Sequence, residues 1–185
     1  MYHELGDFAE GEYSFEVRRS SRSVKLAMKR DGHVDGSKVT VIKEITLPRA
    51  GSVITVDYRI INNGAGTLNA VFGPEINLTM PNADSTKCSI VFNGENKKYG
   101  LSETLQRNKI EALEMRDKLC GFSLKISVSD PCRIWHFPIR TVSQSEKAYE
   151  LNYQGSALFP ALELELGVGE EKRVGFTIEL IEAGK

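Results

Sequence analysis

Apolar and polar residues alternate with a period of two along most of the chain, which is typical of β-strands with one buried and one solvated face. The clearest alternating stretches are residues 13–17, 24–28, 39–47, 54–60, 122–128, 162–166 and 174–180. The third stretch runs into Pro48, which lacks a backbone donor and is expected to end the strand. The chain is therefore predicted to begin with a β-meander.

Turn signals separate these stretches. The pairs Asp31-Gly32 and Asp35-Gly36 supply residues that tolerate a positive φ. Asn62-Asn63-Gly64 directly follows the fourth stretch and predicts a hairpin there. The segment 68–80 is expected to form two strands separated by a bend at Gly73-Pro74, since proline removes a ladder donor.

The segment 94–119 is rich in charged and amide residues. Within it, Ser102-Glu-Thr-Leu could begin a helix, but the helical pattern that follows is weak. We expect 110–116 to be a strand that pairs with 122–128 through a turn near Gly121, and 94–107 to be a loop or a charged edge. No helix of three turns, repeat or linker is apparent, so the chain is predicted to be one all-β domain over 1–185, an antiparallel β-sandwich. The predicted inward residues are Phe15, Val17, Leu26, Val41, Ile54, Val56, Tyr58, Leu124, Ile126, Leu164, Phe176 and Ile178.

Composition excludes several classes of protein. A chain of 185 residues with 41% hydrophobic and 26% charged residues can bury a core without disulfides or a cofactor. A formal net charge of -1 argues against a nucleic-acid partner. There is no apolar run long enough to cross a bilayer, and the first residues lack the pattern of a signal peptide. We expect a cytoplasmic protein without a membrane partner.

The three cysteines, Cys88, Cys120 and Cys132, show no Cys-x-x-Cys spacing. A disulfide framework is therefore not expected, and small buried thiols are the favoured interpretation. A metal site formed by Cys120, Cys132 and His136 would have only three ligands at an unusual spacing, so we predict neither a metal site nor a cofactor.

The stretch 133–155 concentrates aromatic and uncharged polar groups and holds the single tryptophan of the chain. It supplies six candidate binding residues: Trp135, His136, Gln144, Glu146, Tyr153 and Gln154. The bend at Gly73-Pro74 delivers two more, Glu75 and Asn77, on an otherwise apolar segment. Flat apolar rings beside directional donors and acceptors suit a polyhydroxylated ligand.

The same residues have a purely structural interpretation, which the sequence leaves open. Trp135 and Phe137 would then be core anchors, since large aromatic residues usually pack inside. Ser143 and Glu146 would form a local capping arrangement, and Gln154-Gly155 would be a turn. Glu75 and Asn77 would face solvent by ordinary alternation.

Four motifs, in this order, carry a family resemblance: Phe72-Gly-Pro-Glu-Ile-Asn77, Trp135-His-Phe-Pro-Ile139, Thr141-Val-Ser-Gln-Ser-Glu146 and Tyr153-Gln-Gly-Ser-Ala-Leu158. The chain resembles, over its whole length, the C-terminal β-sandwich domain of amylases and 4-α-glucanotransferases of glycoside hydrolase family 57. The resemblance implies a galactose-mutarotase-like sandwich and a catalytic barrel as its partner, with α-glucan or maltooligosaccharide as a possible ligand. It also places both catalytic carboxylates on the barrel, so no residue of this chain is expected to be catalytic.

Three functions remain open at this point. The first is an accessory domain that packs on the barrel of an α-glucan-processing enzyme and contacts its substrate. The second is a stand-alone mutarotase-like enzyme, with His136 as the acid and Glu146 or Glu75 as the base. The third is a purely structural domain. The resemblance favours the first and leaves open whether the parent is an amylase or a glucanotransferase.

Overall fold

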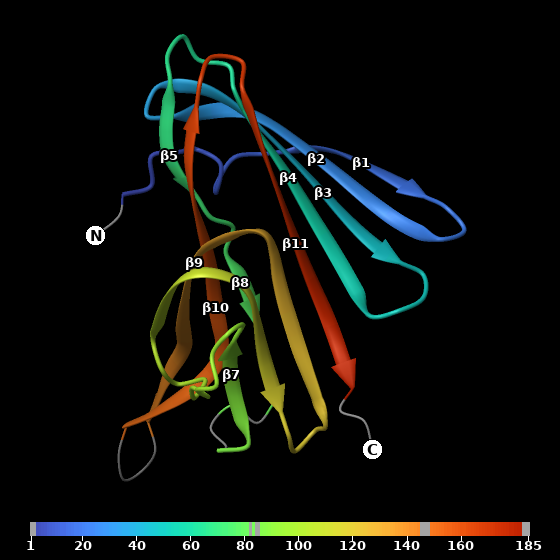
Figure 1. The fold of residues 1–185 in the computed structure, drawn as a ribbon, viewed down its shortest axis with the longest axis vertical. Helices are drawn as coiled ribbons and strands as arrows, with labels where there is room; N and C mark the ends of the chain where they lie inside the picture. The colour runs from blue at the N-terminus through green and yellow to red at the C-terminus, as the bar shows by residue number, and fades with distance from the viewer. Residues whose placement is uncertain (1–2, 82, 84–85, 145–148, 183–185) are drawn as a thin grey trace. The chain divides into compact units, whose positions relative to one another are not determined.

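The computed structural model describes residues 3–81, 83, 86–144 and 149–182, and this part of the chain contains strands but no helix (Figure 1). The all-β prediction is confirmed, and no helix of the described part is available to span a membrane. The eleven strands are β1 (Ser14–Arg19), β2 (Ser23–Val34), β3 (Ser37–Pro48), β4 (Val53–Asn62), β5 (Leu68–Phe72), β6 (Ile76–Leu78), β7 (Cys88–Phe92), β8 (Leu105–Asp117), β9 (Phe122–Gln144), β10 (Tyr149–Leu166) and β11 (Glu171–Glu182).

The chain divides into two compact units. Unit 1 consists of Met1–Phe72 and Glu163–Ile178, and unit 2 consists of Gly73–Leu162 and Glu179–Lys185. Strands β10 and β11 each contribute to both units. A single domain over 1–185 remains a prediction.

Unit 1 is built on an antiparallel meander of β1, β2, β3 and β4, as predicted, with β11 next to β4 (Figure 1). The β2–β3 turn is made by Asp35 at φ 48° and Gly36 at φ 78°, the conformation of a tight hairpin turn. Asp31-Gly32 is not a turn but lies within β2. A Cβ at Gly32 would come within 2.3 Å of the Asp7 carboxylate, so glycine is required there by packing.

The predicted hairpin at Asn62-Asn63-Gly64 is wrong, because the strand partners of β4 are β3 and β11 whereas β5 pairs with β10. Asn62 is fully buried, and its amide donates to the carbonyls of Gly66 and Leu166, both at 2.8 Å. Its side-chain oxygen accepts the Gly64 amide at 2.9 Å. Asn62 therefore ties the loop after β4 to the end of β10.

Unit 2 contains the strand order β7-β8-β9-β10-β6, antiparallel throughout. The predicted strand at 110–116 and its pairing through Gly121 are confirmed, with Gly121 at φ 70° and Asp117 opposite Phe122. Strand β8 starts earlier than expected, at Leu105. The predicted charged loop before β8 contains two core residues, since Tyr99 pairs with Ile90 of β7 and Leu101 is buried.

The core is partly the predicted one. Five of the predicted inward residues are buried: Val41, Tyr58, Ile126, Leu164 and Phe176. Five others are half-buried: Leu26, Ile54, Val56, Leu124 and Ile178. Phe15 and Val17 are 71% and 45% exposed, which contradicts the prediction, because β1 is an edge strand that pairs only with β2. The core of unit 2 includes side chains outside the predicted set, among them Ile90, Phe92, Met115, Ile134 and Leu158.

Replacing Asn62 with alanine leaves the buried carbonyl of Leu166 without this donor and removes the bond to the exposed Gly66. We expect Asn62→Ala to lower the free energy of unfolding by about 2 kcal/mol, since an unsatisfied buried polar group costs about 1–3 kcal/mol. Denaturant titration measures the loss. The matched control is Asn63→Ala, which removes one bond from an exposed side chain to Thr40 and should cost less than about 1 kcal/mol. Equal losses for the two variants would contradict the role of Asn62.

Candidate carbohydrate-binding face

Strand β9 separates the predicted candidates onto two faces of its sheet. Successive side chains of a strand point to opposite sides, so Trp135 and His136 cannot share a face. Trp135 is half-buried on one face, together with the exposed Phe137, whereas His136 is fully buried on the other. The cluster predicted from 133–155 is therefore not a single site.

Trp135 lies on a sheet face that we call the aromatic face, formed by Trp135, Phe137, Phe159, Glu75 and Asn77. In the strand register Trp135 lies opposite Phe159. Phe137 lies opposite Ala157, which in turn lies opposite Asn77. The indole stacks on the Phe159 ring, with a centroid distance of 5.5 Å and an interplanar angle of 16°. The Phe137 ring meets the indole edge-on at 6.5 Å.

The bend at Gly73-Pro74 positions the polar part of the aromatic face. A Cβ at Gly73 would lie 2.3 Å from the Phe159 ring, so only glycine lets that ring pack against the backbone here. The chain then continues through Glu75 into β6. Asn77 donates its amide to the Glu75 carboxylate at 2.9 Å, and both side chains are exposed. Flat rings and solvated hydrogen-bonding groups thus lie on adjoining strands.

The opposite face holds a closed polar network around His136. Nδ1 of His136 lies 2.8 Å from the carbonyl oxygen of Glu103, which can only accept, so Nδ1 is the donor. Nε2 therefore accepts the hydroxyl of Ser156 at 2.7 Å, and the Ser156 oxygen accepts the Tyr153 hydroxyl at 2.9 Å. Burial lowers the pKa of His136, which keeps the imidazole neutral. The network fastens the loop before β8 to β9 and β10.

The remaining candidates lie toward the end of the β9–β10 hairpin. Gln154 is exposed and donates to the Thr141 hydroxyl at 3.1 Å; by alternation along β9, Thr141 is on the same side as Trp135. Gln144 is exposed and lies on the other side. Glu146 lies outside the described residues. The structure thus groups Trp135, Glu75 and Asn77, with Gln154 further along the same side.

Two residues of the aromatic face were absent from the predicted set. Phe137 is two positions from Trp135, so strand periodicity alone could have placed it on the same face. Phe159 could not be placed in this way, because its contact with Trp135 depends on the register between β9 and β10. The sequence carries no direct signal of that register.

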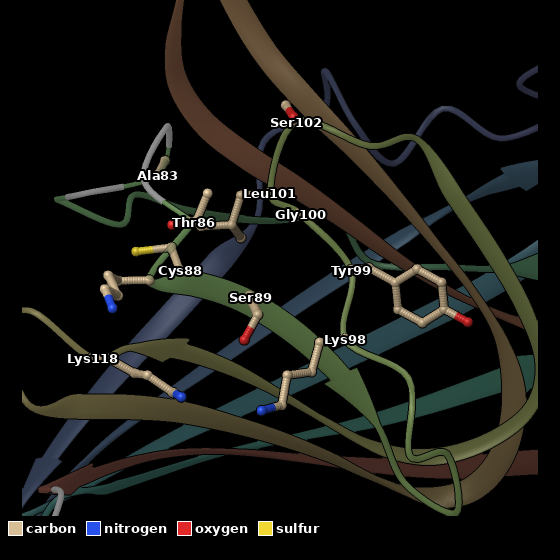
Figure 2. A pocket seen from close by; sticks show the side chains of 11 residues that line it. Ala83, Thr86, Cys88, Ser89, Lys98, Tyr99, Gly100, Leu101, Ser102 and Lys118 are labelled. Carbon is tan, nitrogen blue, oxygen red and sulfur yellow. The ribbon is translucent and has the colours of Figure 1, made fainter.

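A separate pocket of about 420 Å³ lies between β7, the loop 98–102 and the turn after β8 (Figure 2). Figure 2 shows the Lys98 and Lys118 side chains directed to the same region as the Ser89 hydroxyl. The Tyr99 ring at its wall is covered by the Arg107 guanidinium at 4.5 Å. A basic lining without a free ring face suits a small anion better than a stacked sugar.

The cysteines form no common site. Cys88 and Cys132 are buried, as expected, and burial raises the pKa of Cys132 to about 11. Cys120 is exposed in the β8–β9 turn, contrary to the prediction of a buried thiol, because a turn residue has no sheet face to pack against. Within the described residues no group of three histidine, cysteine or acidic side chains is arranged to hold a metal ion.

A family model described as Alpha-amylase/4-alpha-glucanotransferase, C-terminal, matches residues 1–176. The α-amylase of Pyrococcus horikoshii is 31% identical over 154 residues, which are 83% of this chain and 20% of the relative. The 4-α-glucanotransferase of Thermococcus kodakarensis is 27% identical over 162 residues, 86% of this chain and 20% of the relative. The chain thus spans about a fifth of the length of these curated relatives.

Comparison with solved structures agrees with the family match. The 4-α-glucanotransferase of Thermococcus litoralis matches 98% of this chain and 24% of its own, with a TM-score of 0.65 and 26% identity. A putative aldose 1-epimerase of Escherichia coli matches 93% of this chain and 69% of its own, with a TM-score of 0.64 and 17% identity. The latter likeness shows the fold alone. The predicted antiparallel β-sandwich of galactose-mutarotase-like type is confirmed.

The buried imidazole makes stability depend on pH. The pKa of His136 in the folded state lies below its ordinary value of about 6.5, so the unfolded chain binds the proton more readily. The contribution of His136 is complete above about pH 6.5 and is lost as the pH falls from there toward its folded pKa, at up to about 1.4 kcal/mol per pH unit. Denaturant titrations between pH 7.5 and 5 measure this slope.

The control for this prediction removes the buried imidazole itself. His136→Asn should be less stable at neutral pH and should show a flatter dependence below about pH 6.5. A slope that persists in His136→Asn would assign the pH dependence to other groups.

Proposed function

The chain belongs to the family of α-amylase/4-α-glucanotransferase C-terminal domains, and from this premise we propose that it is an accessory domain of an α-glucan-processing enzyme that contacts the glucan through its aromatic face. The observation that carries the glucan contact is the stacked pair of Trp135 and Phe159 beside the exposed Glu75–Asn77 pair. The partner of the chain in this proposal is the catalytic portion of the same enzyme.

The aromatic face matches the two chemical properties of a glucose unit. A pyranose ring presents apolar C–H groups on its faces, which stack on aromatic rings, and hydroxyls around its edge. Phe137 is exposed beside the half-buried indole of Trp135, so ring surface is available to solvent. The Glu75 carboxylate accepts hydroxyl protons and the Asn77 amide both donates and accepts. A shallow polar site of this kind suits binding along a glucan chain.

The aromatic face does not resemble a retaining hydrolytic centre. Such a centre needs two carboxyl groups about 5–5.5 Å apart on either side of the scissile bond. Glu75 on this face contacts the amide of Asn77 rather than a second carboxylate. We propose that the catalytic carboxylates lie on the portion of the enzyme that the relatives have in addition to this stretch.

A specific observation argues against the stand-alone mutarotase-like alternative. An acid that protonates a sugar must reach it, but His136 is fully buried and both its ring nitrogens are engaged, by Glu103 and Ser156. The solved epimerase is similar to this chain in fold at only 17% identity, which carries no activity over. The accessory function accounts for the exposed rings without requiring a catalytic histidine.

Maltooligosaccharide should change the fluorescence of Trp135, which is the single tryptophan of the chain. We expect a dissociation constant on the order of 1 mM, since each hydrogen bond replaces one to water and nets only about 1 kcal/mol. Phe137→Ala and Asn77→Ala should each weaken binding about 5-fold, because each removes one contact of about 1 kcal/mol. Fluorescence titration, confirmed by calorimetry, measures both.

Phe15→Ala is the matched control for Phe137→Ala, since it removes another exposed phenylalanine that lies in unit 1 and not on the aromatic face. Its dissociation constant should equal that of the parent sequence. If sugar at tens of millimolar changes neither the Trp135 fluorescence nor the heat measured by calorimetry, the glucan contact is refuted. The chain would then be a purely structural domain.

The 185-residue chain should release no reducing sugar from starch and should transfer no glucan between maltooligosaccharides. The reason is that the two carboxylates of retaining chemistry are proposed to lie on the catalytic portion. Reducing-end assays and chromatography of the products measure this. Turnover that survives stringent purification and is abolished by Glu75→Gln would place chemistry on the aromatic face and overturn the accessory function.

A further inference from the structure

One face of the β1–β4 sheet in unit 1 is mostly apolar on all four strands, and we call it the open apolar face. Across the strands, Val17 lies opposite Leu26, Leu26 opposite Ile45, and Ile45 opposite Val56. Because alternate residues share a face, the register defines the whole set. Its members are Phe15, Val17, Arg19, Val24, Leu26, Met28, Lys43, Ile45, Leu47, Ile54, Val56 and Tyr58.

This face is the continuation of the core of unit 1. Further along the same strands the same side of the sheet carries Val41 and Ile60, which are 5% and 2% exposed. Toward the other end, Ile45 and Val56 are only half-buried and Leu47 is 51% exposed. The strands therefore continue to carry apolar residues on this side beyond the region where the core of unit 1 covers them.

The reverse side of the same sheet is polar and carries ion pairs. Lys25 forms an ion pair with Glu44 at 2.6 Å across β2 and β3. Arg59 pairs with Glu171 at 2.6 Å across β4 and β11. An antiparallel sheet with one polar face normally packs its other face against something apolar. A contiguous exposed apolar face of this kind marks an interaction surface.

The open apolar face carries two charged residues, Arg19 at the end of β1 and Lys43 within β3. The Lys43 ammonium lies 5.5 Å from the centroid of the Tyr58 ring, and burial lowers its pKa. Within the described part of the chain, no carboxylate forms an ion pair with Lys43. A partner that covered this face would bury the ammonium further, which is costly unless the partner supplies a carboxylate.

We infer that the open apolar face is the surface that docks on the catalytic portion of the enzyme, through an apolar patch that carries a carboxylate opposite Lys43. This inference rests on the proposed function. The chain spans about a fifth of its curated relatives, so proteins of this family carry a large further portion in the same polypeptide. A permanent interface of that kind resembles a domain core cut in half, which is the character of this face.

The test mixes the 185-residue chain with the 4-α-glucanotransferase of Thermococcus litoralis from which the segment matching this chain has been removed, once circular dichroism and a cooperative thermal transition have shown that the shortened enzyme is folded. Sedimentation velocity should show a complex. The double variant Phe15→Ser/Leu47→Ser should weaken it at least 10-fold, and Lys43→Glu should weaken it as well. Phe15 and Leu47 are exposed, so these substitutions leave the core intact, and equal melting temperatures verify this.

The matched control is Glu16→Ser/Thr46→Ser, which alters the reverse side of the same strands and should leave the complex unchanged. Absence of a complex, or a complex insensitive to the double variant, would overturn the inference. A self-associated chain that the double variant turns into a monomer would assign the face to a second copy and also overturn it. The glucan titration is independent, because the double variant keeps the aromatic face, so loss of docking and loss of sugar binding are distinguishable.

Discussion

The alternation of side chains along antiparallel strands is the constraint on which the rest of this structure depends. Each long strand has one face that is too apolar for water, and the fold is stable where such faces cover one another. Val41 and Ile60 in unit 1, and Ile90 and Met115 in unit 2, show where this cover is complete. The aromatic face and the open apolar face are two places where neighbouring strands keep apolar side chains at the surface. Function is most reasonably sought at these two faces.

Much of the fold was predictable because the signal of a strand is local. The meander β1–β4, the hairpin through Gly121 and the lack of a long helix among the described residues all follow from period-two alternation and turn residues. The hairpin expected at Asn62 failed for a physical reason. The Asn62 side chain is committed to the carbonyl of Leu166, a residue 104 positions away, and such a contact overrides the local turn preference.

The candidate site shows the same division between local and nonlocal information. Motif grouping placed Trp135, Glu75 and Asn77 together, and all three lie on the aromatic face. The inclusion of His136 neglected that adjacent residues of a strand point to opposite faces, and its buried bonds to Glu103 and Ser156 show the result. Phe159 was beyond prediction, since its stacking on the indole is fixed by interstrand register and by the space that Gly73 leaves.

The polar groups at each surface decide which kind of partner it suits. A sugar loses hydrogen bonds to water when it binds, so its site must return them, and the aromatic face offers the Glu75 carboxylate and the Asn77 amide beside its rings. The open apolar face offers only the Lys43 ammonium, the Arg19 guanidinium at one edge and the buried Tyr58 side chain across four strands. A glucan laid on it would leave most of its hydroxyls unpaired, at a cost of about 1–3 kcal/mol each. An apolar protein surface incurs no such cost, so the two faces are suited to different partners.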